Sequence, residues 1–128
     1  MKIGFVGLRR MGANIVLNAL GKGVEVAAYN RTAQITKEFA KEAMSKRLHP
    51  SYSLQELCAR LKPPRTIWIM VTAGKAVDEI IAGLLPHLRR GDTVIDGGNS
   101  FYRDSVRRYR HLRKQGINYV DCGTSGGL

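Results

Sequence analysis

The chain has 128 residues, and its 21 Lys and Arg against 10 Asp and Glu give a formal net charge of +11. A content of 44% hydrophobic and 24% charged residues is ordinary for a globular protein. The length suits one domain over residues 1–128, which would bury roughly two-thirds of the surface of its unfolded chain, and argues against a two-domain enzyme. No apolar run reaches the ~20 residues that span a bilayer, so we expect a cytoplasmic protein without membrane contact.

The sequence offers little for a disulfide framework or a metal site. Cys58 and Cys122 are too few and too far apart for either, and reduced thiols are expected. His49, His87 and His111 have no metal-ligand spacing and suggest no Ser-His-Asp arrangement. The positive charge still requires an anionic partner, which leaves nucleic acid, an acidic membrane or a phosphorylated small molecule.

Strands and helices alternate along the chain. The pattern predicts a strand over residues 2–7, a helix over 11–20, a strand over 24–29 and a helix over 33–44. A polar connection over 49–53 leads into a helix through residue 61, opened by the capping box of Ser53 and Glu56 and stopped by two prolines. A strand over 66–71, a helix over 76–88 broken at Pro86, a strand over 93–96, a helix over 102–115 and a strand over 117–120 complete the pattern.

This alternation predicts an α/β fold of the Rossmann type, a doubly wound and mainly parallel sheet with helices on both faces. The length leaves no room for a second, helical domain. In such sheets, ligands bind beyond the carboxyl ends of the strands, and most of the glycine clusters of this chain come directly after predicted strands.

The first such cluster, residues 7–12, reads Gly-Leu-Arg-Arg-Met-Gly. It matches the Gly-x-Gly-x-x-Gly turn that places backbone amides and a helix N-terminus against a pyrophosphate, except that Arg9 replaces the middle glycine. Two interpretations of Arg9 remain open. Its side chain blocks the pyrophosphate, or the loop shifts and the guanidinium binds a phosphate. We expect weakened but not abolished binding.

Asn30, Arg31 and Thr32 come directly after the second predicted strand, with Arg31 24 positions after Gly7. A carboxylate at this offset would bind the ribose hydroxyls of NAD, whereas an amide, a guanidinium and a hydroxyl suit the 2'-phosphate of NADP. NADP is therefore favoured, with NAD as the alternative cofactor. A second interpretation is that the tripeptide only turns the chain and that Thr32 caps the next helix.

Two further polar loops come after later strands. Residues 96–100 read Asp-Gly-Gly-Asn-Ser and residues 123–127 read Gly-Thr-Ser-Gly-Gly. Such loops bring an amide, hydroxyls and bare backbone to the crevice where a nicotinamide would lie, and these groups suit a polyhydroxylated substrate. Each loop taken alone could also be a simple turn.

Together these motifs and residues 70–74, Met-Val-Thr-Ala-Gly, resemble decarboxylating 6-phosphogluconate dehydrogenase over the whole chain, with the short bacterial and archaeal form the most similar. The resemblance implies oxidation of 6-phosphogluconate by hydride transfer to NADP or NAD, then decarboxylation to ribulose 5-phosphate, in the pentose phosphate pathway. It implies cofactor contacts from Gly7, Leu8, Arg9, Arg10, Met11, Gly12, Asn30, Arg31, Thr32, Val71, Thr72, Ala73 and Asn99. Substrate contacts fall on Asn99, Ser125, Gly126 and Gly127.

The resemblance also implies that no catalytic residue lies in this chain. In the family, the catalytic lysine and the acid glutamate lie beyond the Ser-Gly-Gly motif, on a helical domain that also forms the homo-oligomer. Lys75 is expected to be a solvated residue at a helix start rather than a substitute base. The alternatives are a cofactor-binding fragment without catalysis and the domain of a related 3-hydroxyacid dehydrogenase.

The last predicted helix is strongly basic, which raises a nucleic-acid alternative. Its basic residues at positions 103, 107, 110, 111 and 114 are predicted to form an outer stripe, with Val106, Tyr109 and Leu112 facing inward. A solvated helix covering a sheet has this pattern, so we expect 6-phosphogluconate and a dinucleotide as partners and no nucleic acid.

Overall fold

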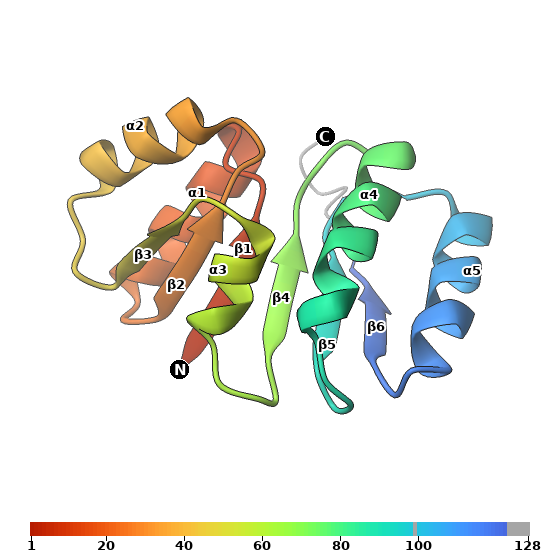
Figure 1. Ribbon diagram of the computed structural model, residues 1–128. Coiled ribbons are helices and arrows are strands. Elements are labelled where there is room, and N and C mark those ends of the chain that lie inside the picture. The colour runs from red at the N-terminus through yellow and green to blue at the C-terminus, as the bar shows by residue number, and fades with distance from the viewer. Residues whose placement is uncertain (99, 123–128) are drawn as a thin grey trace.

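The computed structural model describes residues 1–98 and 100–122, and these form one sheet with helices on both faces (Figure 1). The strands are β1 (Lys2–Val6), β2 (Glu25–Tyr29), β3 (Leu48–Ser51), β4 (Thr66–Ile69), β5 (Thr93–Asp96) and β6 (Asn118–Asp121). The helices are α1 (Arg10–Gly21), α2 (Ala33–Ala43), α3 (Leu54–Ala59), α4 (Lys75–Leu84), the short 3-10 helix η1 (Leu85–His87) and α5 (Tyr102–Arg113).

All neighbouring strands pair in parallel, in the order β3-β2-β1-β4-β5-β6. The chain winds outward from β1 to β3, then returns to the other side of β1 to build β4 to β6. This is the doubly wound order of a dinucleotide-binding sheet, and the reversal between β1 and β4 creates a crevice at their carboxyl ends. The predicted fold class is therefore confirmed.

Two apolar layers hold the helices against the sheet. On one face, α1 and α2 pack through Val16, Leu20 and Phe39 onto Phe5 and Val26. On the other face, α3, α4 and α5 contribute the side chains of Leu57, Ile81, Leu84 and Leu112 to a second cluster that includes Ile67 and Val94. Figure 1 shows this division, with α3 and α4 in front of the strands and α1 behind them.

The prediction of a polar connection over residues 49–53 is wrong, because residues 48–51 form the edge strand β3. Leu48 to Ser51 pair in register with Val26 to Tyr29 of β2. Pro50 lacks an amide hydrogen, and a proline in the sequence argues against a strand. An edge strand nevertheless tolerates proline. Leu48 and Ser51 are both buried, and contacts with β2 and α2 rather than local propensity stabilise this strand.

Two helix boundaries are explained by local signals. The predicted capping box of α3 is confirmed, since Ser53 Oγ accepts a hydrogen bond of 3.0 Å from the amide of Glu56. The Glu56 carboxylate accepts one of 2.8 Å from the amide of Tyr52. The helix predicted over 76–88 begins one residue earlier, at Lys75, and gives way to η1 after Leu84, because Pro86 breaks the α-helical pattern.

The predicted inner face of α5 is wrong in two of its three residues. Leu112 is buried, but Val106 and Tyr109 are 41% and 42% exposed. Ser105 and Arg108 are buried instead, and Arg108 is only 2% exposed. The predicted outer stripe did not include Arg108 and gave it no partner, whereas in the structure Arg108 lies among acidic partners from α4 and β5.

Within residues 1–98 and 100–122, none of the helices has the length and apolar character needed to cross a membrane. The same residues contain no group of three or more His, Cys, Asp or Glu placed to hold a metal ion.

Candidate functional site

A cavity of about 230 Å³ opens at the carboxyl ends of β1, β2 and β4, where the sheet order reverses. We call it the crevice. Three loops and one helix face contribute its lining: Val6, Gly7, Arg9, Asn30, Arg31, Thr32, Met70, Val71, Thr72, Ala76, Glu79 and Ile80. The three predicted cofactor segments, far apart in the sequence, therefore meet at one place.

We call the Gly-x-Gly-x-x-Gly turn of residues 7–12 the fingerprint. Its first and third glycines are required by the backbone. Gly7 has a φ of +105°, and a Cβ at this position would overlap the carbonyl oxygen of Met70 at the end of β4. A Cβ on Gly12 would overlap the carbonyl oxygen of Gly7. The first close approach holds the end of β1 against the end of β4, and the second brings the start of α1 directly onto the end of β1.

Arg9, at the middle position, precedes α1 as its N-cap with φ −76° and ψ 179°. Any residue adopts this extended backbone, so position 9 needs no glycine for conformational reasons. In the part of the chain that the structure describes, no side chain caps α1, and its first turn contains no acidic residue. The amides at this helix start therefore have no side-chain cap, an arrangement that binds phosphate in many proteins.

Asn30 ties the fingerprint loop to the end of β2. It is buried, and its side-chain oxygen accepts a hydrogen bond of 2.9 Å from the amide of Leu8. Its own amide donates to Thr36 Oγ1 at 3.1 Å, and its side-chain nitrogen lies 3.5 Å from the carbonyl oxygen of Thr32. The Asn30 side chain thus fixes the loops of the crevice as well as lining it.

Arg31 and Thr32 are exposed and line the crevice. Thr32 is the N-cap of α2, as the alternative interpretation expects, but its hydroxyl makes no cap hydrogen bond among the described residues. Over those same residues, no ion pair involves Arg31 or Arg9. Two guanidinium groups without a described carboxylate partner therefore flank the crevice, which favours a ligand with more than one anionic group.

The loop between β4 and α4 forms the opposite wall. Of the predicted residues, Val71 and Thr72 line it, whereas Ala73 is exposed outside the lining. Ala76, Glu79 and Ile80 complete the wall and were not predicted from the sequence. Their i, i+3, i+4 spacing places them on one face of α4, a signal that could have identified them once α4 was known to border the site.

The remaining predicted site residues lie elsewhere. Leu8 and Gly12 are buried outside the lining, and Arg10 and Met11 are exposed on the first turn of α1. Lys75 lies at the first position of α4 outside the lining, as predicted for a residue of the helix start. The predicted substrate residues Asn99, Ser125, Gly126 and Gly127 lie outside the described residues.

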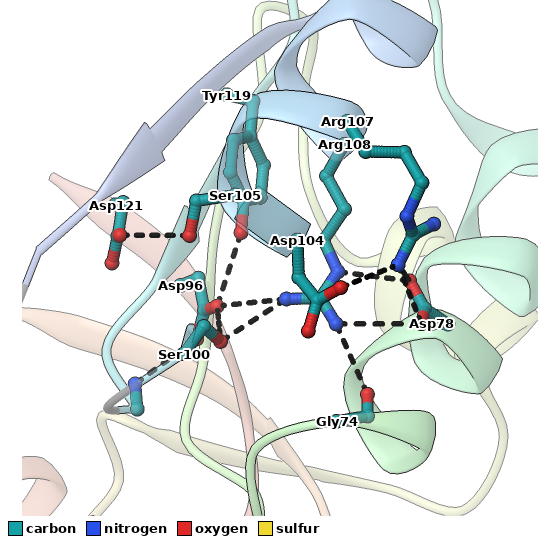
Figure 2. Close-up of polar contacts among 11 residues, drawn as sticks. Gly74, Asp78, Asp96, Ser100, Asp104, Ser105, Arg107, Arg108, Tyr119 and Asp121 are labelled. Atoms are coloured by element: carbon teal, nitrogen blue, oxygen red, sulfur yellow. Dashed lines mark hydrogen bonds and ion pairs between the residues drawn. The ribbon is translucent and has the colours of Figure 1, made fainter. Parts of the chain in front are cut away.

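A buried polar network supports the wall formed by the β4–α4 loop (Figure 2). At its centre, the carboxylate of Asp96 at the end of β5 accepts hydrogen bonds from the Gly98 amide at 3.0 Å, from the Tyr119 hydroxyl at 3.0 Å and from the Ser100 hydroxyl. Burial, together with the smaller effect of the Asp96 charge, raises the pKa of Tyr119 to about 12. Tyr119 therefore remains a hydrogen-bond donor throughout the neutral range.

Comparison with known proteins decides the family. A family model described as the NAD binding domain of 6-phosphogluconate dehydrogenase matches residues 2–128. The chain belongs to this family. The predicted resemblance is thereby confirmed, and the alternative of a related 3-hydroxyacid dehydrogenase domain is set aside.

Two relatives from Bacillus subtilis (strain 168) differ in their cofactor. The chain is 46% identical to the NAD(+)-dependent 6-phosphogluconate dehydrogenase and 44% identical to the NADP(+)-dependent one. Each match covers 98% of this chain and 27% of the relative. Family membership thus supports a nicotinamide cofactor but does not choose between NAD and NADP, and the residues of the crevice must decide.

A solved structure agrees with the fold. The 6-phosphogluconate dehydrogenase of Plasmodium falciparum, solved in its apo form, with NADP+ and with its substrate 6-phosphogluconate, superposes with a TM-score of 0.88 at 37% identity. The match covers 96% of this chain and 27% of that one. The chain thus spans about a quarter of the length of the relatives it matches.

Proposed function

We propose that residues 1–128 form a single NADP(H)-binding domain whose crevice holds the dinucleotide. The observation that carries this proposal is the pair of guanidinium groups, Arg9 and Arg31, at a crevice where no described side chain caps the start of α1. The pyrophosphate would lie at the start of α1, where backbone amides and the helix dipole favour an anion. The adenosine ribose would lie beside Arg31.

The preference for NADP rests on the three residues after β2. A carboxylate there would repel a 2'-phosphate, and this chain has Asn30, Arg31 and Thr32 instead. Because the Asn30 oxygen already accepts from Leu8, Arg31 and the hydroxyl of Thr32 are the groups left to bind the phosphate. A planar guanidinium suits phosphate geometry through paired hydrogen bonds.

The wider proposal is a role in oxidative decarboxylation of 6-phosphogluconate to ribulose 5-phosphate in the cytoplasm, by a homo-oligomeric enzyme. Support comes from the named activity of the relatives and from free cysteines, which suit a reducing compartment. In this proposal, Asn99, Ser125, Gly126 and Gly127 position the substrate. The base and acid lie on a further helical domain, so residues 1–128 alone bind cofactor without turnover.

Calorimetric titration of the chain with NADPH and NADH tests the cofactor assignment. We expect NADPH to bind at least about tenfold more tightly, because a charge-assisted phosphate contact contributes ~1.5–3 kcal/mol. Arg31→Ala should remove this preference and leave NADH binding unchanged. Lys37→Ala, an exposed cation on α2 outside the crevice, is the matched control and should alter neither affinity. Failure of the wild-type chain to bind either nucleotide would refute the proposal.

A second measurement tests whether residues 1–128 bind the cofactor without catalysing the reaction. The chain, mixed with 6-phosphogluconate and NADP+, should show no formation of NADPH by absorbance. Measurable turnover would show that residues 1–128 contain a base of their own and would overturn the assignment of catalysis to a second domain.

A further inference from the structure

Arg108 occupies an unusual place for a residue of a basic surface helix. It is 2% exposed, and its guanidinium contacts two loops at once (Figure 2). Toward α4 it donates to Asp78 through Nε at 2.8 Å and to the carbonyl oxygen of Gly74 at 3.1 Å. Toward β5 it donates to Ser100 Oγ at 3.1 Å and lies 3.6 Å from the Asp96 carboxylate. Arg108 therefore bridges the start of α4 and the turn after β5.

These two loops also touch each other directly. The amide of Gly97 donates to the carbonyl oxygen of Ile69 at 2.8 Å. A Cβ on Gly97 would overlap the indole nitrogen of Trp68, and one on Gly98 would lie 3.0 Å from the carbonyl oxygen of Val71. The turn after β5 thus packs on the back of the segment whose side chains line the crevice. A shift of this turn would release Val71 and Thr72.

Arg108 and Asp78 both carry their charges at physiological pH. Burial lowers the pKa of the Arg108 guanidinium, but its hydrogen bonds and its attraction to Asp78 raise the pKa. The net pKa lies above the ordinary value of an arginine. The hydrogen bond from Arg108 is also the main reason why the pKa of Asp78 lies below its usual range. Asp96 is fully buried, so removal of Arg108 leaves a buried carboxylate with no described cation beside it.

We propose that Arg108 is a positioning residue that locks the turn after β5 to the start of α4 and so holds Val71 and Thr72 in place for the nicotinamide half of the cofactor. This role rests on the proposed function. It makes affinity for the whole dinucleotide depend on a side chain that is not among those lining the crevice. The adenosine half, beside Arg31 on the far side of β1, is independent of it.

The test separates the two halves of the cofactor. Calorimetry with NADPH and with adenosine 2',5'-bisphosphate, which lacks the nicotinamide half, is compared for the wild-type chain and Arg108→Met. We expect the variant to lose about tenfold in NADPH affinity and to keep its affinity for the bisphosphate within about twofold. Equal losses for both ligands, or no loss for either, would overturn the proposal.

Two control variants separate positioning from general destabilisation. Arg107→Met removes the neighbouring cation, which also pairs with Asp78 at 3.1 Å but is 57% exposed and, among the described contacts, reaches neither Asp96 nor Gly74. Asp92→Asn weakens a buried ion pair at the opposite end of the sheet. Below their unfolding temperatures, both should keep the NADPH-to-bisphosphate affinity ratio of the wild-type chain. A changed ratio in either would contradict a specific role of Arg108.

A third readout needs no nucleotide. Trp68 is the only tryptophan, and its indole nitrogen is buried against Gly97 without a hydrogen-bond partner among the described residues. Release of the turn should admit water to this nitrogen and shift Trp68 emission to the red in Arg108→Met but not in Arg107→Met. Should Arg108→Met fail to fold, Arg108→Lys keeps the charge without the span of the guanidinium and should show the same shift. If Trp68 emission is the same in the Arg108 variants as in the wild-type chain, the bridge is refuted. If emission shifts as expected but the wild-type chain binds no nucleotide, only the proposed function is refuted.

Discussion

The backbone amide of Leu8 donates a hydrogen bond of 2.9 Å to the side-chain oxygen of Asn30, across 22 positions of sequence. This bond joins the fingerprint loop to the end of β2. Because one loop is proposed to bind the pyrophosphate and the other the ribose phosphate, the bond fixes the distance between two anion sites of a single ligand. Rigid spacing of this kind lowers the entropic cost of binding.

Asn30→Ala should therefore lower both stability and cofactor affinity. The buried Leu8 amide loses its acceptor, which costs about 1–3 kcal/mol of unfolding free energy in urea titrations. The affinities for NADPH and NADH should fall together, since the substitution disturbs the loop rather than the contact with the 2'-phosphate. Asn30→Asp is the matched variant, because it keeps an acceptor for Leu8 but adds a negative charge and should shift preference toward NADH. An Asn30→Ala variant with the same free energy of unfolding as the wild-type chain would contradict this role of Asn30.

Arg9→Gly should strengthen NADPH binding several-fold by calorimetry, because we expect the Cβ at the middle fingerprint position to obstruct the pyrophosphate more than the guanidinium attracts it. Arg9→Ala keeps the Cβ but removes the guanidinium, and so separates obstruction from charge. We expect Arg9→Ala to bind no more tightly than the wild-type chain. Equal NADPH affinity in the wild-type chain and Arg9→Gly would eliminate interference by Arg9.

Asp92→Ala should be among the most destabilising single substitutions. Asp92 is fully buried and accepts hydrogen bonds from the amides of Arg65 at 2.6 Å and Arg89 at 2.8 Å, and it forms an ion pair with the Arg65 side chain at 3.1 Å. Breaking a buried pair from one side costs about 3–5 kcal/mol. Thermal unfolding measures this loss. Because Asp92 precedes β5, at the end of the sheet away from the crevice, NADPH affinity of the folded protein should not change.

The two thiols should differ sharply in reactivity. Cys58 is 1% exposed, and burial raises its pKa from 9.0 to about 11, whereas Cys122 is partly exposed. An aromatic disulfide reagent at pH 8 should label one thiol quickly in the folded chain and none in Cys122→Ser. Rapid labelling of Cys122→Ser would show that Cys58 is accessible.

The raised pKa of Cys58 also predicts a pH dependence of stability. The folded protein favours the protonated thiol, so this contribution is fully present below pH 9 and is lost as the pH rises through about 11. The wild-type chain should lose about 2–3 kcal/mol of unfolding free energy relative to Cys58→Ala over this range, at 1.36 kcal/mol per pKa unit. Parallel stability profiles of the two proteins would contradict the assignment.

The basic helix α5 should not confer nucleic-acid binding. Arg107 and Arg108 are engaged with Asp78, which leaves fewer free cations than the sequence suggests. Filter binding with duplex DNA over a salt series should show no submillimolar affinity at physiological salt. Tight binding that falls steeply with salt would indicate a phosphate-backbone contact and would revive the nucleic-acid alternative.

Much of the fold was predictable because its signals are local. The apolar runs of β1 and β4, the capping box at Ser53, the positive φ of Gly7 and the contact of Gly12 with Gly7 each act over a few residues, and the structure uses them as predicted. The edge strand β3 was not predictable in this way. Its four residues include a proline and a histidine, and only pairing with β2 makes them a strand.

The residues of the site also differ in whether local signals in the sequence predict them. The sequence by itself determined the α/β fold, the glycine-built turn at the start of α1 and the arginine after β2, because spacing along the chain encodes each of them. Only the tertiary structure decided that the Asn30 side chain binds the Leu8 amide, that α4 lines the crevice and that Arg108 is buried. The partners of Arg108 in Gly74, Asp78 and Ser100 lie 34, 30 and 8 positions away, so the helical pattern, which places Arg107 but not Arg108 in the outer stripe, could not show which groups bind Arg108.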